Sequence, residues 1–304
     1  MKNIPKASAK LREVVDFYLV SPAFRRLKSS SQRDYEVHLS AVVDTPVEGR
    51  YLGDYRCKNI KVRHLTQAYE QWLQVGVRTA NYRKAVLSTA WKNAMRYDVF
   101  THDPVSLVQA ITEQPRRTVW TKDQVRTFLA TSYSDFRWRS IGLIVHMSYD
   151  WAQRVGDMRL LTWDALNLDQ CTMDLTQSKR NAEIHLPISK GLCDMLRQQK
   201  EQFGFQDYVA PKVQPEFGCY NPYSKLEIHR YINEILAKAN LPSELTAMDL
   251  RRTAVREMME GGVDLSNIMQ VTGHKNVNSV KPYMVNTLSG ASKALAARGN
   301  NEDE

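Results

Sequence analysis

Three separated segments carry the side chains whose types and spacing could do chemistry. Arg154 and Asp157 lie one helical turn apart in the first segment. Arg251 stands near the start of an amphipathic stretch, and His274 and Tyr283 are nine residues apart further on. Taken singly, each feature has an ordinary explanation, because surface ion pairs, arginines on amphipathic helices and packed tyrosines are all common.

Together, these side-chain types suit work on a phosphate group. A guanidinium is permanently charged and donates two hydrogen bonds in a fork, so Arg154 and Arg251 could hold one phosphate from two sides. A tyrosine hydroxyl has an ordinary pKa of about 10 and is a poor nucleophile unless nearby positive charge favours the phenolate. A cluster of arginines would supply that field.

The elements that must position these residues are mostly helical. In the first third of the chain, helices are predicted at 11–20, 31–43, 62–73 and 79–97, with a loop at 49–60. Residues 1–111 are therefore expected to form a small, basic, four-helix domain. The polar stretch 112–118 is typical of a linker between domains.

A second domain is expected over 119–298. Thr121 and Gln124 have the spacing of a capping box, and helical patterns follow at 136–149, 154–161, 225–239 and 249–260. Alternating residues at 167–177 and 182–189 predict the strands of a small antiparallel sheet. The expected fold class is mainly α with a small antiparallel sheet (α+β), and 299–304 is expected to be an acidic tail.

The three segments together resemble the tyrosine recombinase family, also called phage integrases. The run Arg154-Val155-Gly156-Asp157 matches the family's first arginine box, and Met248-Asp249-Leu250-Arg251 matches its second, usually His-Asp-Leu-Arg, except at the His position. The family's Gly-His, with a Tyr nine residues later, is matched by His274 and Tyr283. Its lysine in a Gln-x-Lys context is matched by Gln177-Ser178-Lys179. The resemblance covers about 11–297, and its N-terminal part is similar to the family's helical core-binding domain.

The resemblance implies a role for each matched residue. Arg154, Arg251 and His274 would stabilise the charge on a scissile DNA phosphate, and Tyr283 would attack it to form a 3′-phosphotyrosine. Lys179, on a turn between strands, would be the general acid for the departing 5′ oxygen. No metal and no other cofactor is needed.

Two further residues are expected to support this site. Asp157 would orient Arg154 or its neighbourhood. Met248 stands at the family's His position, and a thioether cannot donate a proton or a strong hydrogen bond. The contribution of the family His is therefore missing here.

Positive charge is concentrated in the first part of the chain. Lys and Arg number 20 against 11 Asp and Glu up to Arg117, and 22 against 22 from Thr118 onward. This asymmetry indicates a surface that neutralises phosphates, although a solvated basic face with no polyanion partner fits the composition equally well. The expected DNA-binding residues are Lys28, Arg33, Arg83, Lys84, Lys92, Arg116 and Arg117.

Several partners are implied by the resemblance: double-stranded DNA with attachment or core sites, three further copies of the chain in a homo-tetramer on DNA, and accessory DNA-bending or directionality proteins. The segment 287–299 is predicted to be an amphipathic helix that either exchanges between protomers or packs on its own domain. Membrane-spanning runs and a secretory signal are not found, so a cytoplasmic location, at the bacterial nucleoid or in a host cell, is expected. The four cysteines lack metal-ligand spacing, which predicts neither disulfide nor zinc.

The expected function is a site-specific DNA recombinase that integrates or excises a phage or mobile element. An alternative is a catalytically weak, recombinase-like protein that binds DNA for regulation, since Met248 replaces the family His. A type IB topoisomerase, which shares the chemistry but relaxes supercoils without a defined site, is a third hypothesis. Covalent DNA adducts that depend on Tyr283 would separate the first hypothesis from the second.

Overall fold

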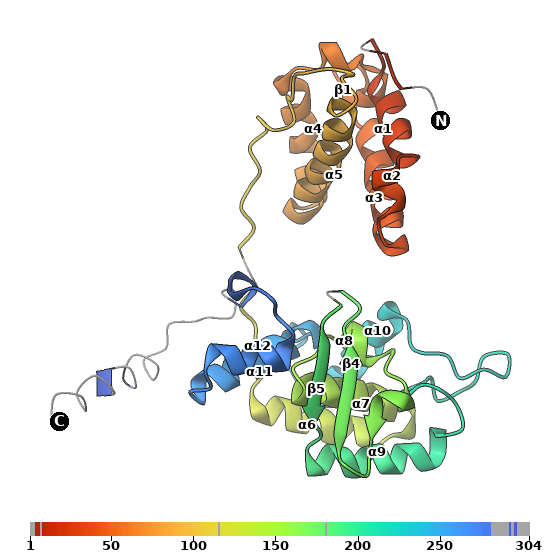
Figure 1. Cartoon of the computed structure of the whole chain (residues 1–304), viewed down its shortest axis with the longest axis vertical. Helices are drawn as coiled ribbons and strands as arrows, with labels where there is room; N and C mark the ends of the chain where they lie inside the picture. Colours follow the sequence, from red (N-terminus) through yellow and green to blue (C-terminus); the bar gives the residue numbers. More distant parts are fainter. Residues whose placement is uncertain are drawn as a thin grey trace. The chain divides into compact units, whose positions relative to one another are not determined.

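The chain divides into two compact units, Met1–Gln114 and Pro115–Glu304. The computed structural model describes residues 4–6, 8–114, 116–179, 181–280, 292 and 295–296, and Figure 1 shows their elements. The expected fold class is confirmed, since helices dominate both units and the sheets are small and antiparallel. Among the described residues, no helix has the length and apolarity needed to cross a membrane.

Helices make up most of the N-terminal unit: α1 (Leu11–Leu19), α2 (Pro22–Arg25), α3 (Ser29–Val43), α4 (Val62–Val75) and α5 (Val77–Met95). Their apolar faces meet in one core, in which Leu11, Leu39 and Trp91 are fully buried. The chain turns between α4 and α5 at Gly76 alone, with φ +140°, a conformation open to glycine. The four long predicted helices are present, and the four-residue α2 was not predicted.

The segment predicted as a loop at 49–60 has more structure than expected. It contributes β2 (Arg50–Tyr51), which pairs antiparallel with β1 (Pro46–Val47), and two 3₁₀ turns, η1 (Leu52–Asp54) and η2 (Cys57–Asn59). Strands of two residues have no alternation that a sequence pattern could detect.

Seven helices of the C-terminal unit lie in the part of the chain that the structure describes: α6 (Lys122–Tyr133), α7 (Phe136–Asp150), α8 (Val155–Met158), α9 (Lys190–Phe203), α10 (Lys225–Lys238), α11 (Ala247–Glu260) and α12 (Leu265–Thr272). The predicted capping box opens α6, since Gln124 N donates to Thr121 Oγ1 at 3.2 Å and Thr121 N to Gln124 Oε1 at 2.8 Å. Most of α7 is buried, and α7 contacts α6, α10 and α11.

The helix predicted at 154–161 is wrong in length, because α8 has only four residues. Beyond it, Thr162 is extended and forms an isolated antiparallel bridge with Tyr208. This tertiary pairing overrides the apolar periodicity of the segment.

The predicted sheet has three antiparallel strands in the order β3 (Leu166–Asn167), β4 (Thr172–Thr176) and β5 (Glu183–Pro187). Met173 pairs with Leu186 and Leu175 with Ile184, so one face of the sheet is apolar and packs on the core. The turn after β4 carries Lys179, and Figure 1 shows β4 and β5 running side by side to this turn.

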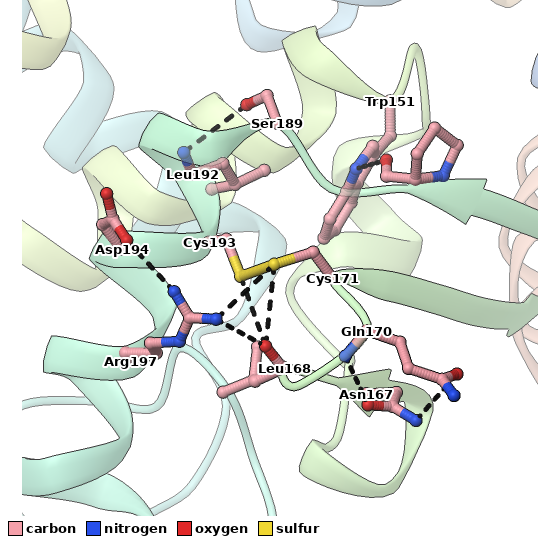
Figure 2. The surroundings of a disulfide bond; sticks show 11 residues. Trp151, Asn167, Leu168, Gln170, Cys171, Ser189, Leu192, Cys193, Asp194 and Arg197 are labelled. Carbon is pink, nitrogen blue, oxygen red and sulfur yellow. Dashed lines mark hydrogen bonds and ion pairs between the residues drawn. A yellow bond between two sulfur atoms is a disulfide. The ribbon is translucent and has the colours of Figure 1, made fainter.

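The prediction that no disulfide forms is wrong. Cys171 and Cys193 are joined by a disulfide with their Cα atoms 6.2 Å apart (Figure 2), inside the range that such a bond requires. Cys171 precedes β4 and Cys193 lies in the first turn of α9, so the packing of α9 brings the two together. Their separation of 22 residues belongs to no motif, and a sequence pattern could not pair them. Arg197 donates to the Leu168 carbonyl beside the two sulfur atoms at 2.8 Å.

Candidate active site

Arg154 stands where the chain leaves α7 and enters α8. Ala152 has φ +50°, and this turn is followed by an extended Arg154 at the N-cap of α8. The Arg154 side chain, 24% exposed, lies 3.7 Å from the carboxylate of Asp157. Its Nη1 donates to Gln177 Oε1 at 2.9 Å, directly after β4. Arg154 is thus held toward the sheet and away from bulk solvent.

Two buried glutamines connect Arg154 to the end of α12. Gln177 Nε2 donates to Gln153 Oε1 at 2.6 Å and to the Thr272 carbonyl at 3.0 Å. Gln153 Nε2 donates to the carbonyls of Trp151 and Val271 at 2.8 and 2.7 Å. Both amides are almost fully buried and bonded on both sides, so their orientation is fixed.

Arg251 joins this network from α11. It is 6% exposed, and its Nη2 donates to the Thr272 carbonyl at 2.6 Å and lies 3.3 Å from His274 Nε2. The Thr272 oxygen therefore accepts from Arg251 and from Gln177, which also binds Arg154. The structure thus brings Arg154, Arg251 and His274 together, although they are far apart in the sequence.

His274 has contacts on both sides of its ring. Thr272 Oγ1 donates its proton to the Ile268 carbonyl at 2.7 Å, so it accepts from His274 Nδ1, 2.6 Å away. The other ring nitrogen, Nε2, lies 3.3 Å from Arg251 Nη2. These contacts orient the ring beside Arg251.

Gly273 makes the close packing of this corner possible. Its φ of +66° ends α12 in the left-handed region. A Cβ at this position would lie 2.8 Å from Ile184 Cδ1 and 3.0 Å from Gln177 Cδ. The left-handed backbone and the lack of room for a Cβ both favour glycine between Thr272 and His274.

Asp157 binds the turn that carries Lys179. Its side chain, 2% exposed, accepts from the main-chain nitrogen of Ser178 at 3.2 Å and from the Ser178 hydroxyl. Lys179 is the next residue and is exposed. Asp157 thus contacts both Arg154 and the hairpin, and the contact with the hairpin is the closer one.

A cavity of about 460 Å³ opens beside His274. It is lined by residues 181–183 of the β4–β5 hairpin, by Met269 and Gln270 of α12, and by 273–275. His274 is thus reached from this opening.

The remaining predicted residues differ in their exposure and in whether they lie within the described part of the chain. Tyr283 lies outside the described residues. Met248 is 76% exposed at the start of α11. Of the expected DNA-binding residues, Lys28, Arg33, Lys92 and Arg117 are exposed, Arg83 and Lys84 are half-buried, and Arg116 pairs with Asp249 at 3.0 Å. Their contacts with DNA stay predictions.

Sequence reasoning missed Gln153 and Thr272 as parts of the site. Gln153 directly precedes Arg154, and a buried glutamine is unusual enough to be a signal once burial is known. Thr272 acts through its carbonyl and hydroxyl close to its own helix end, which side-chain type alone does not indicate.

The C-terminal unit thus gathers two arginines and a histidine around one buried network. Residues 118–288 match the model of the phage integrase family. The chain therefore belongs to the phage integrase family, and the resemblance noted from its motifs is confirmed.

Comparisons with individual proteins agree with the family. The chain is similar to tyrosine recombinase XerC from Bacillus subtilis, with 21% identity over 226 residues, which is 72% of this chain and 73% of that protein. Its structure is similar to that of a lambda integrase dimer bound to a COC′ core site, with TM-score 0.74, 20% identity and coverage of 91% and 77%. It is also similar to the Tn1549 transposon integrase in complex with circular intermediate DNA, with TM-score 0.75, 15% identity and coverage of 95% and 99%. The structural likenesses show a shared fold.

Proposed function

We propose that the protein is a site-specific DNA recombinase that cleaves and rejoins strands through a 3′-phosphotyrosine on Tyr283. The observation that carries the proposal is the single network that joins Arg154, Arg251 and His274 through Gln177 and the Thr272 carbonyl. Structural ion pairs on a surface do not need buried amides to hold them. A pair of guanidinium groups held by one network is suited to hold a phosphate.

In this mechanism, the phenolate of Tyr283 attacks the scissile phosphorus while the bond to the 5′ oxygen breaks. Arg154, Arg251 and His274 stabilise the charge on the non-bridging oxygens. Lys179 gives a proton to the departing 5′ oxygen, which leaves as a hydroxyl. The phosphotyrosine conserves the bond energy, so a 5′ hydroxyl from another strand can reverse the step and release Tyr283.

The proposed substrate is double-stranded DNA, which the N-terminal unit helps to bind. Its support is the excess of 20 Lys and Arg over 11 Asp and Glu up to Arg117. The similar lambda integrase has been seen as a tetramer bound to a Holliday junction. We extend that arrangement to this chain, with four protomers acting on two duplexes that border a phage or other mobile element.

A trapping assay on nicked duplexes with a random core tests this function for any target sequence. The duplexes would be incubated with the protein, and DNA linked covalently to protein would be isolated and sequenced. We expect adducts with the wild type and none with Tyr283→Phe. Tyr51→Phe, at a tyrosine that is 53% exposed in the N-terminal unit, is the matched control and should trap DNA normally.

The second candidate is a DNA-binding regulatory protein with little or no cleavage, and Met248 favours it. An exposed thioether at the family's His position supplies neither a proton nor a strong hydrogen bond. If the recombinase proposal is right, Met248→His should raise the rate of adduct formation. DNA binding that is salt-sensitive, forms no adduct and is indifferent to Tyr283→Phe would favour the regulatory protein instead.

A further inference from the structure

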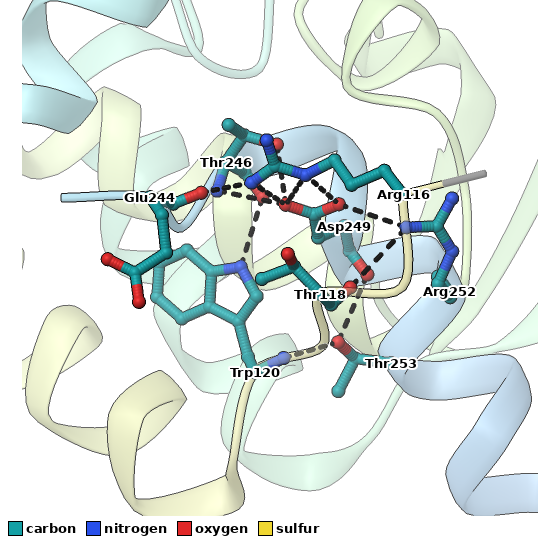
Figure 3. A network of polar contacts seen from close by, with 8 residues as sticks. All are labelled: Arg116, Thr118, Trp120, Glu244, Thr246, Asp249, Arg252 and Thr253. Atoms are coloured by element: carbon teal, nitrogen blue, oxygen red, sulfur yellow. Dashed lines mark hydrogen bonds and ion pairs between the residues drawn. The ribbon is translucent and has the colours of Figure 1, made fainter. Parts of the chain in front are cut away.

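The segment that enters the C-terminal unit is fastened to the helix that carries Arg251 (Figure 3). Arg116 Nε donates to the two carboxylate oxygens of Asp249 at 3.1 and 3.2 Å, and its Nη2 lies 3.0 Å from Oδ2. The same Nη2 donates to the Glu244 carbonyl. The side chain of Asp249 is 2% exposed and that of Arg116 is 44% exposed. The pair therefore joins a buried anion to a half-exposed cation.

Further contacts extend this junction along α11. Trp120 N donates to Thr253 Oγ1 at 2.9 Å, and Trp120 Nε1 donates to the Thr246 carbonyl at 3.0 Å. Arg252 Nη1 lies 3.3 Å from Asp249 Oδ1 and 3.4 Å from the Thr118 carbonyl. Residues 116–120 are thus bound to the first two turns of α11, as the dashed lines of Figure 3 show. We call this set of contacts the linker clasp.

The linker clasp and the candidate active site hold opposite sides of the same helix end. Asp249 and Arg251 are two positions apart, which places them about 200° apart around the helix. Asp249 faces the linker and accepts from Thr246 N and Oγ1 at 3.1 and 2.7 Å, whereas Arg251 faces Thr272 and His274. Any shift of this helix end would therefore move the Arg251 guanidinium.

We propose that Arg116 is a positioning residue for strand cleavage, which acts through Asp249 to hold Arg251 against the scissile phosphate. This proposal rests on the proposed function. It also gives Arg116 a different role from the DNA phosphate contact that its charge predicts. Through the carboxylate of Asp249, the linker residue Arg116 helps to hold the catalytic Arg251 in position. Arg252 remains as a second cation beside Asp249, so loss of Arg116 leaves the buried carboxylate paired.

A double-mutant cycle in the trapping assay tests the role of Arg116. Arg116→Ala should slow adduct formation at saturating DNA about tenfold, since small misplacements of catalytic groups are costly, while the affinity for DNA and its salt dependence stay unchanged. Asp249→Asn keeps an oxygen acceptor for Thr246 but removes the charge. In the Asp249→Asn background, Arg116→Ala should add no further loss, because interacting residues are not additive.

Two variants complete the design. Arg126→Ala removes an exposed arginine of α6 that pairs with Asp123 of the same helix, and it should leave the rate unchanged. Arg116→Lys keeps the charge without the fork and should be intermediate. Thermal unfolding of each variant sets a common assay temperature at which all are folded.

Three outcomes would overturn the inference. An unchanged rate in Arg116→Ala would remove the positioning role. Equal fold-losses in the wild-type and Asp249→Asn backgrounds would mean that Arg116 does not act through Asp249. If Arg116→Ala has a normal rate at saturating DNA but binds DNA more weakly and with less dependence on salt, Arg116 contacts a DNA phosphate instead. A wild type that forms no adduct at all would instead refute the proposed function, and this inference with it.

Discussion

Thr272 contributes a main-chain oxygen to the site, and the positions of both arginines depend on it. Arg251 binds this oxygen directly, and Gln177 connects it to Arg154. Its position is set by the end of α12 and by the left-handed Gly273 that follows. At the scale of single residues, the site is therefore held by buried amides and a carbonyl as much as by the charged groups that would meet the DNA.

Substitution of Gly273 by alanine should displace the residues that hold the two arginines of the site. The left-handed conformation costs alanine about 1–2 kcal/mol, and the new Cβ would press on Ile184 and Gln177. We expect adduct formation to fall more than tenfold, with DNA binding retained. Gly191→Ala, where a Cβ meets nothing within 4 Å, is the control in the same trapping assay. Equal rates for both variants would contradict this account.

Asp157→Ala should impair leaving-group protonation, because Asp157 holds the backbone and hydroxyl of Ser178 next to Lys179. The variant should cleave an ordinary nicked substrate slowly. A substrate with sulfur in place of the 5′ bridging oxygen needs no proton on departure, so most of the deficit should disappear, as it should for Lys179→Ala. Asp174→Ala, on the exposed face of the same hairpin, should cleave both substrates normally. A deficit that is equal on both substrates would show that Asp157 acts elsewhere.

The chemically distinctive residues of this site could be predicted from sequence, but the residues that support them could not. Arg154, Arg251 and His274 stand in motifs with fixed local spacing, and the structure brings them together. Gln153 and Thr272 act across more than 90 residues of chain, through an amide and a carbonyl. Amides and carbonyls occur everywhere, so their partners are known only from the fold.

At the scale of elements, the β4–β5 hairpin connects two features of the C-terminal unit. Its turn carries Gln177 and Lys179, and at its opposite end Cys171 is bonded to Cys193 of α9. The hairpin is thus tied covalently to the helical core at one end and by hydrogen bonds to α8 and α12 at the other.

The disulfide should stabilise the C-terminal unit when it is formed. A crosslink across 22 residues is expected to contribute about 3 kcal/mol to the free energy of unfolding. Urea unfolding of the oxidised protein, with and without a reductant, would measure this difference. Cys171→Ser combined with Cys193→Ser should abolish the response to reductant, whereas Cys219→Ser, at an exposed free thiol, should leave it intact. A wild type that is indifferent to reductant would argue against the crosslink.

The long elements were predictable because their periodicity is repeated over several turns. The helices near 62–73 and 136–149 and the strand near 182–189 appear close to their expected bounds, whereas the stretch 167–177 divides into the end of β3, a turn and β4. The hairpin of β1 and β2 and the short α8 were missed or overextended, because two to four residues show no period and tertiary pairing decides them.

Across the whole molecule, three buried or half-buried histidines are expected to make both units sensitive to acid. Burial lowers the pKa of His38 and of His64 in the N-terminal unit below the ordinary 6.5. Burial likewise lowers the pKa of His146 in α7, against the opposing effect of Asp150. A lowered pKa means that the folded state favours the neutral ring. The stabilising contribution is complete above about pH 6.5 and is lost as the pH falls from there through the lowered values.

We expect the thermal unfolding temperature to fall as the pH is lowered from about 7.5 to 5.5. His146 Nδ1 lies 2.9 Å from the Tyr133 hydroxyl, a contact that glutamine can also make. His146→Gln should therefore flatten the decline, as followed by scanning calorimetry. His229→Gln, at an exposed position on α10, should decline as steeply as the wild type. A wild-type unfolding temperature that does not change over this interval would refute the assignment.

The shared Thr272 carbonyl also has a consequence during synthesis on the ribosome. Gln177 leaves the exit tunnel 95 residues ahead of Thr272, the acceptor that links it to Arg251, and Arg154 leaves earlier still. A polypeptide that ends before Thr272 therefore lacks the oxygen that joins Gln177 to Arg251, however well its earlier helices have folded. The network would form only after most of the C-terminal unit has been synthesised.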